Sequence, residues 1–114
     1  MAKSTFKGPI VSVAGFKPAS SSSQAMTYIK SGTIAVDPAS LATLSSSETS
    51  VTISGAAVGD IVIMNPPASL ETVLAFSGAR VSAANTVLVR LTNVTAGSVD
   101  GASRTWTYTI IRIA

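Results

Sequence analysis

The sequence predicts an all-β protein, a small antiparallel β-sandwich or jelly-roll-like barrel preceded by an N-terminal arm. Short runs rich in Val, Ile and Thr are separated by clusters of Gly, Pro, Asn, Asp and Ser at a spacing of roughly 8–12 residues, which is typical of such folds. No segment places apolar residues at the period of an amphipathic helix. These patterns leave the order of the strands open.

The composition predicts one domain with an unusual surface. A chain of 114 residues is long enough for a single hydrophobic core. Apolar residues make up 46% and charged residues 11%, whereas about a quarter of an average chain is charged. Either Ser and Thr cover the surface of a monomer, or neighbouring subunits cover part of it. The net charge is +3 and the basic residues are scattered, so we expect no nucleic-acid partner.

The first 24 residues differ from the rest of the chain. We assign residues 1–24 to an N-terminal arm with a Ser-rich linker, and residues 25–114 to the β-sandwich domain. The arm contains one β-prone run, Ile10–Val13, and the stretch from Gly15 to Gln24 has the composition of a linker. An alternative is that Ile10–Val13 is the first strand of the domain and Ser20–Ser23 is a surface loop.

Strand signals follow in order along the domain. Ala25–Lys30 and Thr33–Val36 are expected as two strand pieces around a turn or bulge at Ser31-Gly32. Asp37-Pro38 then ends the strand and could begin one helical turn, with Pro38 at the first helical position. Ser45–Glu48 is expected to be a polar loop.

Two strands are expected in the middle of the domain. Thr49–Ile53 alternates polar and apolar residues, as a half-buried strand does. Ile61–Met64 is apolar on both faces, which indicates a strand central in a sandwich or buried at a subunit contact. Pro66-Pro67 ends this strand, because proline cannot donate a ladder hydrogen bond.

The last third of the chain gives the clearest signals. Val73–Phe76 and Ala79–Val81 form a strand pair or one strand bent at Ser77-Gly78, and Ala83–Asn85 is a turn. In Thr86–Val94, Val87, Val89 and Leu91 are expected on one side of a strand and Arg90 and Thr92 on the other. The final run places Trp106, Tyr108 and Ile110 inward and Thr105, Thr107 and Thr109 on solvent. We therefore expect the aromatic residues to belong to the core rather than to a sugar-binding platform.

Residues for catalysis are scarce. The chain has no histidine and no cysteine, so the commonest acid–base group, the thiolate nucleophile and the commonest zinc ligands are missing. We expect no enzymatic activity, no cofactor and no metal. The five acidic residues, which are expected in turns, are Asp37, Glu48, Asp60, Glu71 and Asp100. Asn93-Val94-Thr95 matches a glycosylation acceptor, which we interpret as a chance match.

Targeting signals are also missing from the sequence. Met1–Lys7 is not followed by the apolar core of a secretory signal, and no apolar run approaches the ~18 residues that a membrane helix requires. We expect a soluble protein that is made in the cytoplasm and has no membrane partner.

A set of short motifs carries a resemblance to a known family. The set comprises Gly55-Ala-Ala-Val-Gly-Asp60, Pro66-Pro67, Ser77-Gly-Ala-Arg-Val-Ser-Ala-Ala-Asn-Thr-Val87, Val89-Arg-Leu-Thr-Asn93 and Trp106. With these motifs the chain resembles a module of tailed-phage virion proteins, in particular the small capsid decoration, or cement, proteins of phages that infect cyanobacteria and other bacteria. The resemblance covers about Gly32 to Arg112 and leaves the arm unmatched.

The resemblance implies a β-sandwich-like fold, no catalysis, and homotrimers or other multimers seated on a capsid. The implied partner is the major capsid protein, whose neighbouring subunits the protein would bridge, and the implied location is the capsid surface of the virion. A head or tail fibre module for attachment to the host surface is the alternative. We expect the arm to contact the capsid through its cationic and large apolar residues, namely Lys3, Phe6, Lys7, Ile10, Phe16 and Lys17.

Overall fold

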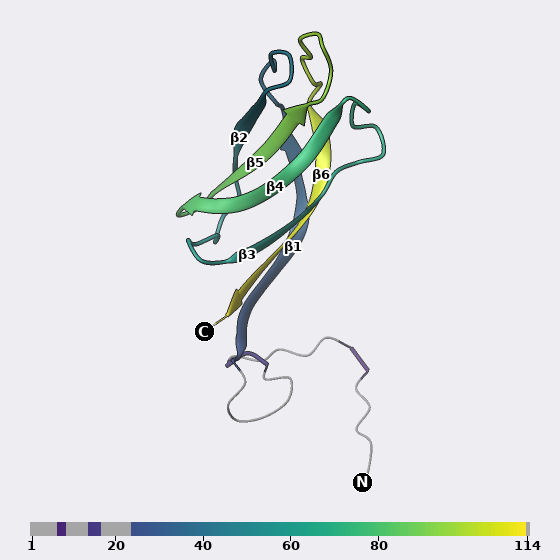
Figure 1. Cartoon of the computed structure of the whole chain (residues 1–114). Coiled ribbons are helices and arrows are strands. Elements are labelled where there is room, and N and C mark those ends of the chain that lie inside the picture. Colours follow the sequence, from purple (N-terminus) through teal and green to yellow (C-terminus); the bar gives the residue numbers. More distant parts are fainter. Residues whose placement is uncertain (1–6, 9–13, 17–23, 114) are drawn as a thin grey trace.

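Two antiparallel three-stranded sheets pack face to face (Figure 1). A computed structural model describes residues 7–8, 14–16 and 24–113, and this part of the chain contains no helix. One sheet has the order β1-β6-β3 and the other the order β2-β5-β4. The strands are β1 (Met26–Val36), β2 (Ser46–Thr52), β3 (Ile61–Asn65), β4 (Leu74–Ala83), β5 (Thr86–Asn93) and β6 (Arg104–Ile113). The predicted all-β sandwich is therefore confirmed.

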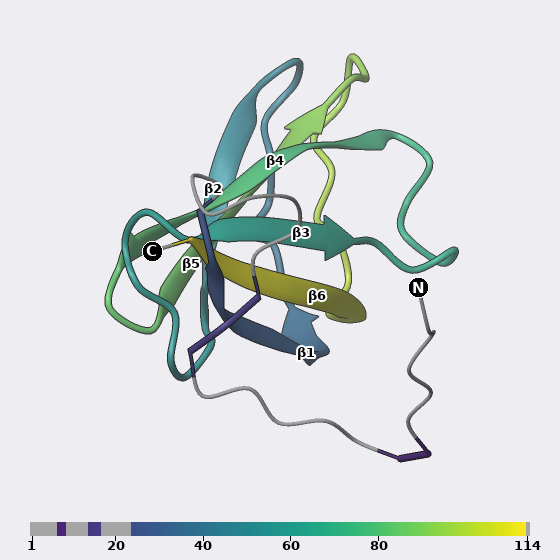
Figure 2. The same cartoon turned by 90° about the horizontal axis from the view of Figure 1, so that it is seen from below.

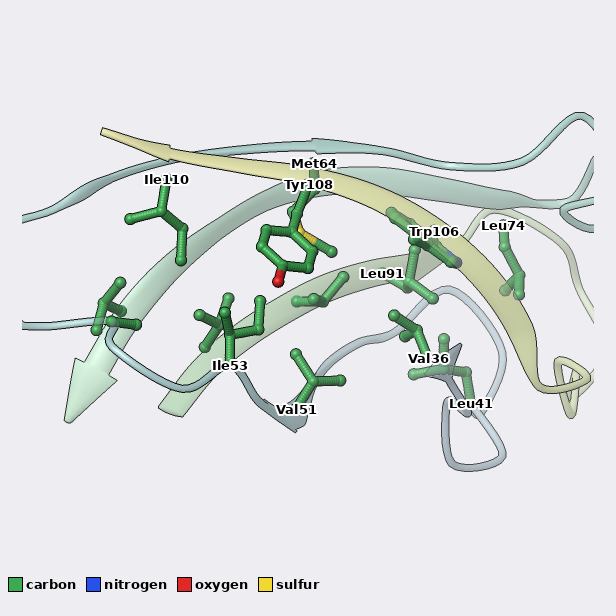
Figure 3. Packing of buried hydrophobic residues seen from close by; sticks show 14 residues of the cluster. Val36, Leu41, Val51, Ile53, Met64, Leu74, Leu91, Trp106, Tyr108 and Ile110 are labelled. Carbon is green, nitrogen blue, oxygen red and sulfur yellow. The ribbon is translucent and has the colours of Figure 1, made fainter. Parts of the chain in front are cut away.

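The core lies between β6 and β5, the central strands of the two sheets (Figure 3). Trp106, Tyr108 and Ile110 of β6 point inward and are buried, as the alternation predicts. The facing residues of β5, Val87, Val89 and Leu91, are also buried. Phe76 of β4 meets Trp106 edge to face, with ring centroids 5.2 Å apart. Other core residues come from the remaining strands and from loops, among them Val36, Leu41, Val51, Ile53, Ala56, Met64, Leu74 and Val81.

Strand β3 is an edge strand, so the first of the two alternatives for Ile61–Met64, a central strand, is wrong, whereas the second, burial at a subunit contact, stays a prediction. It pairs with β6 alone, and it lies beside β4 of the other sheet (Figure 2). Met64 is buried, but Ile61 and Ile63 are 46% and 54% exposed. The strand is apolar on both faces, as predicted, yet only one face reaches the core.

Strand β1 runs without interruption through Ser31-Gly32, where a turn or bulge was expected. Gly32 lies under the Tyr108 side chain, and a Cβ at this position would come within 2.9 Å of the Tyr108 hydroxyl oxygen. The glycine therefore makes room for a core side chain and does not break the strand. The irregularity in β1 lies nearer its start, between Met26 and Tyr28.

The segment between β1 and β2 also differs from the prediction. No helical turn forms at Pro38. Leu41 is instead buried in the core, and its backbone exchanges two hydrogen bonds with Val99, at 2.8 and 2.9 Å. Ser46–Glu48, expected in a loop, belongs to β2 and pairs with residues 90–92 of β5. The outer face of this sheet is polar, so a Ser-rich strand is compatible with it.

Strand β4 is one bent strand, which is the second of the two predicted alternatives. Its register with β5 shifts between Phe76 and Gly78, and Gly78 has a φ of +134°, which favours glycine. The predicted turn before β5 is confirmed. Asn85 adopts a left-handed φ of 61°, and its side chain accepts a hydrogen bond from the Gly55 N–H at 2.8 Å.

We expect Trp106→Ala to lower the free energy of unfolding by about 3–5 kcal/mol, because it leaves a cavity beside Phe76 at the centre of the core. Thr105→Ala, the adjacent substitution on the exposed side of the same strand, is the control and should change it by less than about 0.5 kcal/mol. Urea denaturation followed by circular dichroism measures both. Equal losses for the two variants would contradict this position of the core.

Candidate functional site

The outer face of the β1-β6-β3 sheet is the most distinctive surface of the described part of the chain. Side chains on alternate positions of the three strands point away from the core. We call this surface the Ile/Thr face, and it consists of Ile29, Ser31, Thr33, Ala35, Ile61, Ile63, Asn65, Thr105, Thr107, Thr109, Ile111 and Ile113.

The register arranges these residues in rows across the three strands. Ile111 of β6 is the partner of Ile29 on β1 and of Ile61 on β3, which gives a row of three isoleucines. In the next row, Thr109 pairs with Ser31 and Ile63, and the hydroxyl groups of Ser31 and Thr109 lie 2.9 Å apart. Apolar side chains thus gather at one end of the face and hydroxyl groups follow toward the other.

No charged residue belongs to the Ile/Thr face. The charged residues of β1 and β6 occupy the alternate positions, on the side of the core, where they are half-buried. Each one is bonded there: Lys30 donates to the Ser54 carbonyl oxygen at 2.6 Å, Arg104 to Glu71, and Arg112 to Asp60. The two strands therefore present a face without charge although they contain three cations.

The outer face of the β2-β5-β4 sheet is different, because it carries charge. Arg80 donates to a Glu48 carboxylate oxygen at 2.9 Å, and Arg90 lies 3.6 Å from the same oxygen. These three side chains and the bend in β4 at Ser77 and Gly78 surround a shallow depression of about 260 Å³. More than half of each arginine side chain is exposed, so these ion pairs contribute little to stability.

A buried carboxylate fastens β3 to the end of β6. Asp60, directly before β3, accepts two hydrogen bonds of 2.8 Å from the guanidinium of Arg112, and a third of 2.9 Å from the Ala57 N–H. Arg112 also donates to the Gly55 carbonyl oxygen at 2.8 Å and lies over the Tyr28 ring, 4.7 Å from its centroid. This cluster holds the row of isoleucines together, since it joins the start of β3, the end of β6 and the start of β1.

The charges in this cluster stabilise each other. The hydrogen bonds from Arg112 lower the pKa of Asp60 below 3.8, although burial of the carboxyl opposes them. The hydrogen bonds to Asp60 likewise raise the pKa of Arg112. The Asp60 side chain is only 2% exposed, so its charge depends on this partner.

A second ion pair joins the loop before β4 to the start of β6. Arg104 donates to one Glu71 carboxylate oxygen through Nε at 3.0 Å and through Nη2 at 2.9 Å. The other carboxylate oxygen is buried beside Gly101, where a Cβ would come within 3.1 Å of it. Three of the five acidic residues, Glu48, Asp60 and Glu71, are thus engaged by arginines rather than gathered at a common site.

Asn93 organises the loops at one end of the sandwich. It is fully buried, its amide nitrogen donates to the carbonyl oxygens of Leu41, Ala42 and Gly97, and its carbonyl oxygen accepts from both the backbone and the hydroxyl of Thr95. A glycan could not be attached to this nitrogen in the folded protein. The match to a glycosylation acceptor is therefore a structural Asn-Thr turn.

Most of the residues that were predicted to contact a partner lie outside the described part of the chain. This applies to Lys3, Phe6, Ile10 and Lys17. Lys7 is exposed. Phe16 is 51% exposed and is hydrogen-bonded through its backbone to Met26. The expected contact surface on the arm remains a prediction.

The described residues contain no group of three or more acidic, His or Cys side chains that could hold a metal ion. None of the described segments forms a helix that is long and apolar enough to cross a membrane. Comparison of the chain with family models, with curated proteins and with solved structures found no match.

The sequence indicated only parts of the Ile/Thr face. The alternation of Thr105, Thr107 and Thr109 correctly indicated an outward side of β6. The apolar run Ile61–Met64 was expected to be covered either by the rest of the sandwich or by another subunit, because such a run gives no sign of which face reaches the core. The exposed side of Ile61 and Ile63 follows from the edge position of β3, and this position depends on pairing between strands that are far apart in the sequence.

We expect the contribution of Asp60 to stability to depend on pH. Its pKa is lower in the folded than in the unfolded chain, so its charged form stabilises the fold above the unfolded pKa near 3.8, and this contribution is lost as the pH falls through the lower folded pKa. The difference in unfolding free energy between the wild type and Asp60→Asn should therefore be largest near pH 6 and shrink toward pH 2. Urea denaturation across this range measures it, and a difference that is constant with pH would contradict the role of the charge.

Proposed function

We propose that this protein is a non-enzymatic structural component of a phage virion, a capsid decoration protein that bridges neighbouring major capsid subunits. The observation that carries the proposal is the charge-free Ile/Thr face, set against an opposite outer face that carries Glu48, Arg80 and Arg90. The motifs that resemble capsid decoration proteins lend it independent support.

The Ile/Thr face has the properties of a docking surface. The centres of protein interfaces are depleted in charged side chains, because each charge must lose its water when the surfaces meet. Ile29, Ile61 and Ile63 are about half exposed in the free chain. Covering them would remove apolar surface from water, which favours binding. The charged face on the other side would then remain in contact with water.

A shallow face of this kind would bind strongly only when several copies bind together. A flat β-surface offers no deep pocket for an anchor side chain, so one copy would bind weakly. In a homotrimer, three such faces bind one lattice together, and the second and third contacts form at a high effective concentration. We propose this arrangement, with the arm residues Lys3–Lys17 as an additional contact to the capsid.

We expect the double substitution Ile61→Lys and Ile63→Lys to weaken binding to capsid shells by about tenfold or more, because two ammonium groups would have to be desolvated at the contact. Co-sedimentation of the protein with shells assembled from the major capsid protein measures the effect. A milder variant, Ile61→Thr with Ile63→Thr, adds no charge and should give a smaller loss in the same direction.

The matched control is Ser50→Lys with Thr52→Lys. These two positions have the same spacing and are also exposed and outward on an edge strand, but they lie on the other sheet. The control adds the same charge and should bind like the wild type. Equal weakening by both double variants would mean that net charge matters and the Ile/Thr face does not, which would overturn the proposal.

We also expect the free protein to form a trimer or another closed oligomer at micromolar concentration, since a chain with 11% charged residues has little charge to keep copies apart. Sedimentation equilibrium measures the oligomeric state. A monomer at every accessible concentration would count against the multivalent mechanism.

The second candidate function is a fibre module that attaches to the host surface. The observation that favours it is the depression lined by Glu48, Arg80 and Arg90, which offers guanidinium groups to an acidic sugar. Arg104, at the start of β6, is paired with Glu71 and lies outside this depression. Binding to a glycan array that is lost in Arg80→Ala, together with no binding to capsid shells, would favour this function over the first.

A further inference from the structure

The outer edge of β1, on the side away from β6, is the longest sheet edge in the described part of the chain. β1 has 11 residues, whereas the other edge strands, β2, β3 and β4, have 7, 5 and 10. The strand contains no proline, and Lys30 is its one charged residue. A long edge with so little charge readily pairs with another strand.

The chain itself reaches this edge at its start. The Phe16 N–H donates to the Met26 carbonyl oxygen at 3.1 Å, and the Met26 N–H donates to the Phe16 carbonyl oxygen at 2.8 Å. This reciprocal pair is antiparallel. Met26 is also the register partner of Ile113 on β6, so Phe16 lies on the opposite, outer side of β1.

The residue before Phe16 stays against β1. Gly15 has a φ of +84° and lies so close that a Cβ would collide with the Met26 carbonyl group, and it would also come within 3.0 Å of the Thr27 Cα. Only glycine satisfies both the backbone conformation and the close approach. Phe16 is paired with Met26, and Gly15 lies against Met26 and Thr27. The chain before Phe16 therefore runs along β1 in the antiparallel direction.

We propose that the outer edge of β1 is a strand-addition site, and that its occupant is the segment Ile10–Val13 of the same chain. This segment lies outside the described residues, and three of its four side chains are β-branched. It is separated from Phe16 by Ala14 and Gly15 alone, so it is the first β-prone segment that can follow the Phe16–Met26 pair along the edge.

The pair sets the register of the added strand. Continued pairing in the antiparallel sense places Val11 opposite Ser31. A bulge at Gly15, for which a left-handed glycine is typical, would shift the register by one residue and place Ile10 opposite Ser31. In either register the sheet gains a fourth strand beside β1, which covers its edge and widens the Ile/Thr face. The inference does not rest on the proposed function.

Disulfide trapping tests the inference in the full chain, which has no native cysteine. Ser31→Cys is combined in turn with a cysteine at Ile10, Val11, Ser12 or Val13, and with Thr5→Cys as the control far along the arm. Paired strands bring cysteines within the 4.4–6.8 Å between Cα atoms that a disulfide needs. We expect an intramolecular disulfide with Val11→Cys or Ile10→Cys to form about tenfold faster than with Thr5→Cys, because pairing raises the effective concentration.

A second series distinguishes pairing from random collision. The same arm cysteines are combined with Ser50→Cys, an exposed position on the other sheet, and we expect no preferred position there. Non-reducing gels and peptide mass mapping identify the products. Equal rates at all arm positions with Ser31→Cys would overturn the strand addition, and a disulfide-linked dimer as the main product would overturn the choice of the same chain as the occupant.

Discussion

Contact between the inward faces of β6 and β5 is the interaction on which the rest of the structure depends. Each strand is the centre of its sheet, so burying Trp106 and Tyr108 against Val89 and Leu91 fixes both sheets at once. Because side chains alternate along a strand, the same contact decides which residues face outward. The Ile/Thr face is therefore a consequence of the core: once Tyr108 and Ile110 point inward, Thr109 and Ile111 must point out.

The sequence predicted features that depend on one strand or one turn. The alternation of β6, the buried side of β5 and the turn at Asn85 were read correctly, because a period of two and a left-handed turn residue are local signals. The Ser-rich start of β2 was mistaken for a loop, since local composition does not reveal that its partner on β5 presents a polar outer face.

Features that depend on distant partners were not predictable in the same way. Gly32 was expected to mark a turn or bulge, yet its role comes from Tyr108 on another strand. Leu41 was expected near a helical turn, yet its backbone pairs with Val99, and the two loops are held together further by buried Asn93. The candidate site has the same origin: the exposure of Ile61 and Ile63 follows from the edge position of β3, which only the strand order reveals.

The polar contacts show how a chain with few charges uses them. Asp60–Arg112 and Glu71–Arg104 join the two ends of β6 to neighbouring loops, and Lys30 ties β1 to the Ser54 carbonyl oxygen. The cations lie around the core, where water reaches them in part and their desolvation cost is moderate, whereas the Asp60 carboxylate is buried and depends on Arg112.

The inward position of Lys30, Arg104 and Arg112 keeps charge off the outer surface of the sheet. A cation that is bonded on the inner side of β1 or β6 leaves its neighbours on the outer side to be Ile, Thr, Ser or Ala. The strands are thus anchored by charge at their rims without placing any charge on the Ile/Thr face. Solubility alone would favour the opposite arrangement, with lysines on the outer positions and threonines at the rim, because surface charge keeps a protein in solution. The observed distribution suits a surface that another protein covers, and this is why we propose that face, rather than the charged one, as the docking surface.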